Sequence, residues 1–313
     1  MSALAEPMVL TRDLVTGMEW NAAQLRELFH LAADIKARPD RYRGALGGRY
    51  LALIFEKPSL RTRVTVEVGI TSMGGSAIFL DHTGTRLGER ECIKDVARNL
   101  ERWVHAIVAR TFEQRAVEEL AAHAAIPVIN ALSDRFHPCQ ALADFFTLEE
   151  KFGALRGLKV AYVGDGNNVC HSLLLAGARL GAHVRVATPA GYEPDAAIVA
   201  EAKRAARESR GKVEVLCSPE EAVAGAQAVY TDVWASMGQE EEAAARERIF
   251  APYQVNEALM AQAAPDAVFL HCLPAHRGLE VTDAVIESPQ SVIFDQAENR
   301  LHAQKAILLT LLA

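Results

Sequence analysis

The chain has 313 residues, of which 50% are hydrophobic and 23% are charged. This length favours two domains with cores of ordinary size, and this balance excludes a disordered or fibrous protein. The formal net charge of -7 argues against a general affinity for nucleic acid or anionic membranes. The five cysteines are odd in number and never form a Cys-x-x-Cys pair, which fits a reducing compartment rather than a disulfide framework or a zinc knot. Because the first twenty residues have no continuous apolar core and no apolar run reaches membrane-spanning length, we expect a soluble cytoplasmic protein.

The first helical pattern begins after Asn21 and ends before Pro39. Asn21 and Gln24, three residues apart, resemble a capping box at its start. After it, short apolar segments alternate with longer helical ones. This alternation is typical of α/β folds with parallel, doubly wound sheets covered by helices. The expected strands are 50–55, 77–80, 104–109, 128–131, 160–163, 184–187, 213–216, 228–231, 268–271 and 292–294.

The domain boundary is expected where a helical stretch over 144–152 gives way to Gly153 and Gly157 before a new strand. This predicts one domain over residues 1–150 and a second over residues 151–300. The last segment, residues 301–313, is an apolar helix candidate that we expect to cross back and pack on the first domain.

Polar residues just past the ends of strands are the candidates for function, because ligands of open α/β sheets bind beyond the carboxyl ends of the strands. Six places qualify: the run from Lys57 to Arg63, Arg110, the run from His137 to Gln140, the run from Gly164 to Asn168, Asp232 with Ser236-Met237-Gly238, and the run from His271 to Pro274.

The run after the first strand has the features of a phosphate site. Pro58 can begin a helix, so Ser59 to Thr62 would offer backbone amides and two hydroxyls at its positive end, with Arg61 beside them. The alternative is a basic, solvated start of a helix. Taken alone, Arg110 could likewise be a surface cation and His137 a satisfied loop histidine.

The run Gly164-Asp165-Gly166 invites a dinucleotide-binding interpretation. However, Val169 occupies the third glycine position, and Thr188 rather than an acidic residue follows the next strand. A nucleotide-dependent dehydrogenase is therefore disfavoured. Asn167 and Asn168 could cap the following helix or bind a ligand, and Cys272 could be an inert core residue.

Taken together, these segments resemble the aspartate/ornithine carbamoyltransferase family over nearly the whole chain, and its ornithine-using members most closely. The carbamoyl phosphate signature Ser-Thr-Arg-Thr-Arg appears as Ser59-Leu60-Arg61-Thr62-Arg63, and His-Pro-x-Gln appears as His137 to Gln140. The ornithine-type features are Asp232 with Ser236-Met237-Gly238, and His271-Cys272-Leu273-Pro274. Two positions depart from the family pattern, since Leu60 replaces the usual Thr and Cys92 stands where relatives commonly have Ser.

The resemblance implies transfer of a carbamoyl group from carbamoyl phosphate to the side-chain amine of L-ornithine, giving L-citrulline and phosphate in arginine biosynthesis. It implies a site between the domains, small-molecule substrates as ligands, and a homo-oligomer that is a trimer or a multiple of trimers. The chemistry requires neither a metal nor an organic cofactor. Negative charge develops on carbonyl and phosphate oxygens during the reaction, and cationic side chains suit its stabilisation.

The roles implied by the resemblance fall on particular residues. The carbamoyl phosphate contacts are Ser59, Leu60 through its backbone, Arg61, Thr62, Arg110, His137, Gln140, Cys272, Leu273 and Arg300, and the ornithine contacts are Asn168, Asp232, Ser236 and Met237. Cys272, Arg110, His137 and Asp232 would act in catalysis. Arg86, in the loop over residues 81–91, would reach the site of a neighbouring subunit.

Two alternatives stay open from the sequence. The first is a family member that uses N-acetylornithine or putrescine as the acceptor. Asp232 discriminates here, because an N-acetylated substrate would leave this carboxylate without an ammonium partner. The second is a non-catalytic binding protein that kept the fold and lost turnover.

Overall fold

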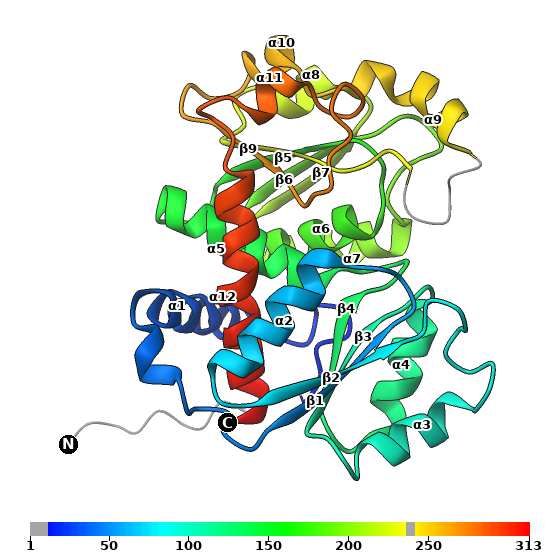
Figure 1. Cartoon of the computed structure of the whole chain (residues 1–313). Helices are drawn as coiled ribbons and strands as arrows, with labels where there is room; N and C mark the ends of the chain where they lie inside the picture. The colour runs from blue at the N-terminus through cyan, green and yellow to red at the C-terminus, as the bar shows by residue number, and fades with distance from the viewer. Residues whose placement is uncertain (1–11, 236–241) are drawn as a thin grey trace. The chain divides into compact units, whose positions relative to one another are not determined.

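The computed structural model describes residues 12–235 and 242–313, and the chain divides into two compact units. Unit 1 comprises Met1–Cys139 and Arg300–Ala313, and unit 2 comprises Gln140–Asn299. Each unit is built around its own parallel sheet with helices on it (Figure 1). The predicted α/β fold class is therefore confirmed, including the return of the last helix to the first domain. The change of unit lies inside helix α5 (Pro138–Phe152), whereas the sequence places the boundary at the end of that helix.

Unit 1 contains a four-stranded sheet in the order β2-β1-β3-β4, in which every neighbouring pair is parallel. Its strands are β1 (Tyr50–Phe55), β2 (Ser76–Asp81), β3 (Ala106–Arg110) and β4 (Val128–Leu132). Helices α3 (Ile93–Leu100) and α4 (Gln114–His123) pack on one face of this sheet. Helix α2 (Leu60–Ser72) and the end of α12 (Ile293–Leu312) lie on the other face (Figure 1).

The first helix of unit 1, α1 (Ala22–Ala37), begins at the predicted capping box. The Asn21 side chain accepts hydrogen bonds from the N–H groups of Ala23 and Gln24, and the Gln24 side chain accepts one from Asn21 N at 2.7 Å. These reciprocal bonds satisfy amides that the first turn of a helix leaves without partners. The short helix η1 (Pro39–Tyr42) follows at once.

Unit 2 contains a five-stranded sheet in the order β7-β6-β5-β8-β9, again parallel throughout. The strands are β5 (Lys159–Val163), β6 (His183–Ala187), β7 (Lys212–Leu216), β8 (Ala228–Thr231) and β9 (Val268–His271). Helices α6 (Asn168–Leu180) and α7 (Ala196–Ser209) lie on one face, and α8 (Pro219–Val223), α10 (Glu257–Met260) and α11 (Asp283–Ile286) lie on the other (Figure 1). Helix α9 (Ala243–Phe250) and the short helix η3 (Ala251–Tyr253) complete the described elements.

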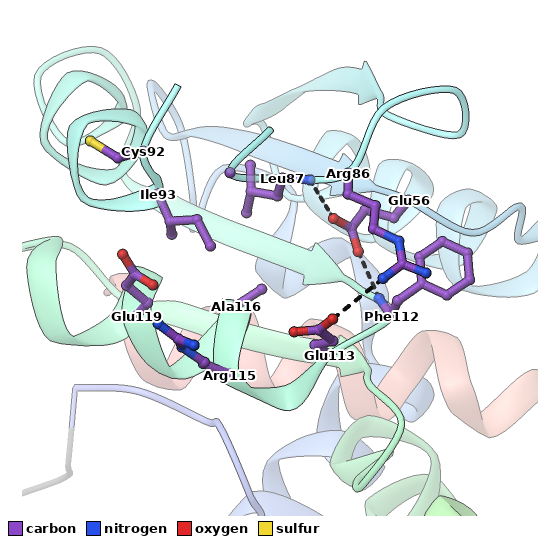
Figure 2. Close-up of a pocket in the computed structure, with 11 residues that line it drawn as sticks. Glu56, Arg86, Leu87, Cys92, Ile93, Phe112, Glu113, Arg115, Ala116 and Glu119 are labelled. Carbon is purple, nitrogen blue, oxygen red and sulfur yellow. Dashed lines mark hydrogen bonds and ion pairs between the residues drawn. The ribbon is translucent and has the colours of Figure 1, made fainter. Parts of the chain in front are cut away.

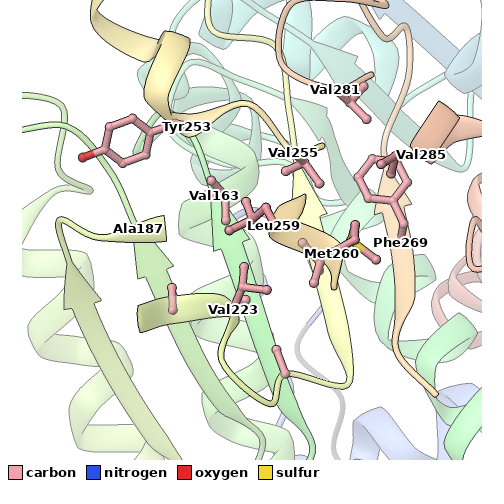
Figure 3. Close-up of a cluster of buried hydrophobic side chains, with 14 of the residues drawn as sticks. Val163, Ala187, Val223, Tyr253, Val255, Leu259, Met260, Phe269, Val281 and Val285 are labelled. Atoms are coloured by element: carbon pink, nitrogen blue, oxygen red, sulfur yellow. The ribbon is translucent and has the colours of Figure 1, made fainter. Parts of the chain in front are cut away.

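One hydrophobic core cluster of unit 2 lies between the sheet and its short helices (Figure 3). Val163 and Phe269 come from strands, and Val223, Leu259 and Val285 come from α8, α10 and α11 (Figure 3). Apolar side chains from both layers interlock here, which removes their surface from water and supplies the main stabilising term of the unit. None of the helices in the described part of the chain combines the length and the apolar character that a membrane crossing requires.

The expectation of a tenth strand over residues 292–294 is wrong. Ser291 forms a single isolated bridge to Phe269, and Val292 N donates to Phe269 O at 3.0 Å, after which α12 begins at Ile293. Val292 and Ile293 are buried while Phe294 is 67% exposed. The apolar run therefore anchors the first turn of a helix, and a run of three residues does not distinguish that role from a strand.

The strand orders place one topological switch point in each sheet. In unit 1 the connections from β1 lead to β2 on one side and to β3 on the other, and in unit 2 the chain runs outward from β5 to β7 and then returns to β8. At such a point the loops after adjacent strands diverge and leave a crevice that receives ligands. The segments after β1 and β3, and those after β5 and β8, contain most of the candidate residues.

Two mid-helix glycines provide a test of this packing. A Cβ at Gly177 in α6 would lie 2.6 Å from Val184 Cγ2 and 2.7 Å from Phe145 Cζ, whereas at Gly69 in α2 the nearest atom would be Lys305 Cγ at 3.6 Å. We expect Gly177→Ala to lower the free energy of unfolding by about 1–3 kcal/mol through overpacking. Gly69→Ala should raise it by about 0.5–1 kcal/mol, because alanine restricts the unfolded chain. Chemical denaturation would measure both, and equal effects of the two variants would contradict the packing described for α6.

Candidate active site

The N-terminus of α2 forms the first part of the candidate site in unit 1. Ser59 caps the helix, and its Oγ accepts a hydrogen bond from Thr62 N at 3.3 Å. The side chain of Leu60 is turned to solvent, since this residue is 74% exposed. Only the backbone of Leu60 can therefore contribute to a site at the helix end. The first turn of a helix presents N–H groups toward an anion, as the sequence predicts for this segment.

Arg300 contacts Thr62, and two further candidates, His137 and Arg110, lie close enough to interact electrostatically with one another. Arg300, from α12, donates through Nη2 to Thr62 Oγ1 at 2.7 Å, and both residues are buried. Burial, together with the positive charges of Arg300 and Arg110, holds the pKa of His137 well below its usual value. His137 is therefore neutral at physiological pH. Arg110 ends strand β3, so the fold brings together residues from four separate segments of the chain.

A third buried cation, Lys57, lies near Arg110. Burial, followed by the nearby charge of Arg110, lowers the pKa of Lys57, although the carboxylates of Asp134 and Glu56 act in the opposite direction. Its Nζ lies 4.6 Å from the centroid of the Phe112 ring. Lys57 was part of the predicted basic run, but its burial and its lowered pKa follow only from the structure.

The predicted cross-subunit residue, Arg86, lines a pocket of about 280 Å³ in unit 1 (Figure 2). The carboxylate of Glu56 accepts hydrogen bonds from Leu87 N and from Phe112 N, the latter at 2.6 Å (Figure 2). Arg86 in turn pairs with Glu113 at 3.3 Å and lies over the Phe112 ring. Glu56 thus ties the loop after β2 to the segment after β3. The sequence analysis missed this residue, and its position as an acidic residue at the end of β1 was the available signal.

Asp232 forms the centre of the candidate site in unit 2. Its Oδ2 accepts a hydrogen bond from Asn167 Nδ2 at 2.8 Å, and its Oδ1 accepts one from Cys272 Sγ at 3.0 Å. Asn167 Oδ1 also caps α6 by accepting from Val169 N and Cys170 N. Asn167 therefore caps α6 and, through the other end of its amide, also holds the carboxylate of Asp232. Asn168 is the first residue of α6, and Ser236 and Met237 lie outside the described residues.

The segment around Cys272 is held by His271, which ends strand β9. The Nδ1 atom of His271 accepts a hydrogen bond from Leu273 N at 2.8 Å, so its Nε2 carries the proton and donates to Glu280 Oε1 at 3.2 Å. Leu273 has a φ of 60°, a conformation that a leucine adopts only under constraint. The His271 ring thereby fixes the backbone next to Cys272. Glu280, fully buried, is a second residue that the sequence analysis missed.

The same residues could be considered as metal ligands. Potential ligand atoms of Asp232, His271 and Cys272 all lie within 4.8 Å of one another. However, both ring nitrogens of His271 and both carboxylate oxygens of Asp232 already make hydrogen bonds within the protein. A metal ion would have to break these bonds, so the donor set is organised as a hydrogen-bond network and not as a vacant coordination shell.

A buried ion pair joins the two loops of unit 2 that hold Asn167 and Asp232. Arg246 Nη1 lies 3.1 Å from Asp165 Oδ2 and also donates to Trp234 O at 2.9 Å. Asp165 precedes Asn167 by two residues, and Trp234 follows Asp232 by two. Burial raises the pKa of Asp165 to about 6, even though Arg246 acts in the opposite direction. Arg246 therefore fixes the distance between the loops after β5 and β8.

Two domains of one known protein family together match nearly the whole chain. The carbamoyl-P binding domain of aspartate/ornithine carbamoyltransferase matches residues 12–150, and the Asp/Orn binding domain matches residues 156–311. The chain belongs to the aspartate/ornithine carbamoyltransferase family. The family resemblance found in the sequence is thus confirmed, and with it the assignment of the chain to a class of transferases.

Individual members of the aspartate/ornithine carbamoyltransferase family are similar over their full length. An ornithine carbamoyltransferase of Anoxybacillus flavithermus is 53% identical, covering 100% of both chains. An anabolic ornithine carbamoyltransferase of Pyrococcus furiosus is 52% identical over 98% of this chain and 96% of its own. Among solved structures, ornithine carbamoyltransferase from Pyrococcus furiosus has a TM-score of 0.93 with 52% identity, covering 96% of this chain and 97% of its own. The anabolic enzyme from Campylobacter jejuni has a TM-score of 0.91 with 36% identity, covering 96% of this chain and 99% of its own.

The raised pKa of Asp165 predicts a dependence of stability on pH. This carboxyl keeps its proton to about pH 6 when folded but only to about 3.8 when unfolded, so its contribution to stability is present below 3.8 and is lost as the pH rises through 6. We expect the unfolding free energy of the wild type, relative to Asp165→Asn, to fall by about 2.5 kcal/mol between pH 4 and pH 8.

Denaturation at several pH values would measure this difference. Asp81→Asn is the control, because hydrogen bonds from Thr83 lower the pKa of Asp81 and its dependence on pH should have the opposite sign. A constant difference between the wild type and Asp165→Asn would refute the description of this ion pair.

Proposed function

We propose that the protein transfers the carbamoyl group from carbamoyl phosphate to the side-chain amine of L-ornithine, giving L-citrulline and phosphate. The observation that carries this proposal is the buried carboxylate of Asp232, held at the switch point of unit 2 by Asn167 and Cys272. A carboxylate in that position suits a substrate with a free ammonium group. The naming of relatives at 52–53% identity as ornithine carbamoyltransferases supports the same acceptor.

In this reaction the amine nitrogen attacks the carbonyl carbon of carbamoyl phosphate. A C–N bond forms, the bond between that carbon and the bridging phosphate oxygen breaks, and the amine nitrogen loses a proton. Negative charge develops on the carbonyl oxygen and then passes to the departing phosphate. Catalysis therefore depends on positive charge and on hydrogen-bond donors that are already in place.

Unit 1 is suited to the phosphate and to the developing charge. We assign the phosphate to the N-terminus of α2, with the backbone of Leu60 and the side chains of Ser59, Arg61 and Thr62. Arg110 and Arg300 supply the buried positive charge near it. The neutral imidazole of His137 has one N–H to donate to the carbonyl oxygen, and because its pKa is low it does not change charge over the physiological range.

Unit 2 is suited to the amine. We assign the α-ammonium group of ornithine to Asp232, with Asn168, Ser236 and Met237 as further contacts of the amino acid. Cys272 and Leu273 would then lie at the reacting amine and the carbonyl. The amine has a pKa of about 10.4, by analogy with lysine, so a site that holds its neutral form raises the rate.

The metabolic role, the cellular compartment and the oligomeric state are proposed from the relatives and from the surface of unit 1. We propose that it serves arginine biosynthesis in the cytoplasm, because two of the similar proteins are named anabolic and all five cysteines are free. We also propose a trimer or a multiple of trimers. Its interface would cover the apolar side chains of Val64 and Val68 on α2 and Ile78 on the edge strand β2, each at least 46% exposed. Arg86 would then contribute to the carbamoyl phosphate site of the neighbouring copy.

Product formation with three amines tests the proposed reaction. The purified protein with carbamoyl phosphate should form citrulline from L-ornithine and should give at least tenfold less product from N-acetylornithine or putrescine. N-acetylornithine lacks the α-ammonium group that would pair with Asp232, and putrescine lacks the α-carboxylate of the amino acid. Product from another amine instead would keep the mechanism and overturn the role of Asp232. No product from any amine, in a folded protein that binds carbamoyl phosphate, would favour the non-catalytic binding protein.

A further inference from the structure

Four buried residues of unit 2 form a continuous chain of hydrogen bonds, which we call the amide relay. His271 N donates to Gln296 Oε1 at 3.0 Å, and Gln296 Nε2 donates to Asp144 Oδ1 at 2.7 Å. Gln140 Nε2 donates to the same Asp144 oxygen at 2.8 Å. Each of these residues is at most 1% exposed, so water cannot substitute for any of the bonds.

The relay has a fixed direction because it starts at a backbone N–H. This group can only donate, so the amide of Gln296 must turn its oxygen toward His271 and its NH₂ group toward Asp144. The Asp144 oxygen is then an acceptor, and the Gln140 amide must also present its NH₂ group to that oxygen. The orientation of Gln140 is therefore set by the chain of bonds and not by a free choice between two amide rotamers.

This direction leaves one atom of Gln140 available. Within the residues that the structure describes, Gln140 Oε1 is buried and accepts no hydrogen bond. A buried acceptor without a donor costs free energy, so the site favours a ligand that brings an N–H group to this position. The carbamoyl group has such an NH₂ group, whereas the methyl group of an acetyl phosphate does not.

We propose that the amide relay makes Gln140 an obligate hydrogen-bond acceptor, and that Asp144 and Gln296 are thereby positioning residues that select carbamoyl phosphate over acyl phosphates without an N–H. This inference rests on the proposed function, because that function places the carbamoyl group beside Gln140. It adds Asp144 and Gln296 to the residues that determine ligand preference, although neither touches the substrate. It also links the preference for carbamoyl phosphate to the backbone of His271, next to Cys272.

A purely structural role for the relay is the competing explanation, since it also joins α5 to α12. Other contacts join the same two helices without involving Gln140. Asn299 Nδ2 donates to Thr147 Oγ1 at 3.0 Å, and Lys151 forms an ion pair with Asp295. Thr147 lies one helical turn beyond Asp144, so Thr147→Val is a matched control that weakens the helix contact and leaves the relay intact.

The test compares three ligands in the citrulline-forming assay. It determines the KM of carbamoyl phosphate and the competitive inhibition constants of acetyl phosphate and inorganic phosphate. In Asp144→Leu, which removes the acceptor, we expect the preference for carbamoyl phosphate over acetyl phosphate to fall at least tenfold while the constant for inorganic phosphate stays within threefold. In Asp144→Asn, whose Oδ1 can still accept both bonds, and in Thr147→Val, the preference should stay within threefold of the wild type.

The outcomes separate this inference from the proposed function. A wild-type protein that makes no citrulline would refute the proposed function itself. If the wild type is active but Asp144→Leu keeps its preference, or if Asp144→Asn loses the preference equally, the relay does not set the selection. Should Asp144→Leu fail to fold, Gln296→Met decides by the same criteria, with Tyr230→Phe as its control, because Tyr230 is the other hydrogen-bond partner of Gln296 Nε2.

Discussion

The contact between Arg300 and Thr62 is the interaction on which the proposed mechanism of unit 1 depends. It fixes a buried guanidinium at the positive end of α2, with Arg110 near enough to act on the same groups. The effect of this concentrated charge is visible in its neighbours, because positive charge contributes to lowering the pKa values of both His137 and Lys57. A polyanion such as carbamoyl phosphate is the ligand that such a field favours, and an arginine cannot relieve the repulsion by losing its proton.

The candidate ligand sites of the two units lie at equivalent points of their sheets but carry opposite charges. Each sheet changes direction next to its first strand, and the loops at that point carry arginines in unit 1 and the carboxylate of Asp232 in unit 2. In both units a second set of residues holds the proposed ligand contacts in place. These are Glu56 in unit 1, and Arg246 with the amide relay in unit 2. The proposed reaction needs this arrangement because it would join an anionic donor to a cationic amino acid, and each requires its own complementary charge.

Much of the fold could be predicted from the sequence, because apolar runs bounded by turns define strands locally. Nine expected strands match within two residues at each end, and the tenth failed because three apolar residues also suit the first turn of a helix. Motifs and strand ends likewise identified Asp232 and Cys272, which the fold brings together. The supporting residues were not predictable in this way. Asp144 and Gln296 are 152 residues apart, and Asp165 and Arg246 are 81 apart, so their partnership exists only once the chain has folded.

The central claim is that unit 1 binds the phosphate of the carbamoyl donor and unit 2 binds the amine. Measuring both KM values in Thr62→Val and Cys272→Ser tests it most directly, since each change is small and the two residues lie in different units. Thr62→Val, which removes the acceptor of Arg300, should raise the KM for carbamoyl phosphate about tenfold with little effect on ornithine. Cys272→Ser should lower turnover and alter the KM for ornithine while the KM for carbamoyl phosphate stays the same. A loss of affinity for carbamoyl phosphate in Cys272→Ser, with ornithine unaffected, would contradict the account.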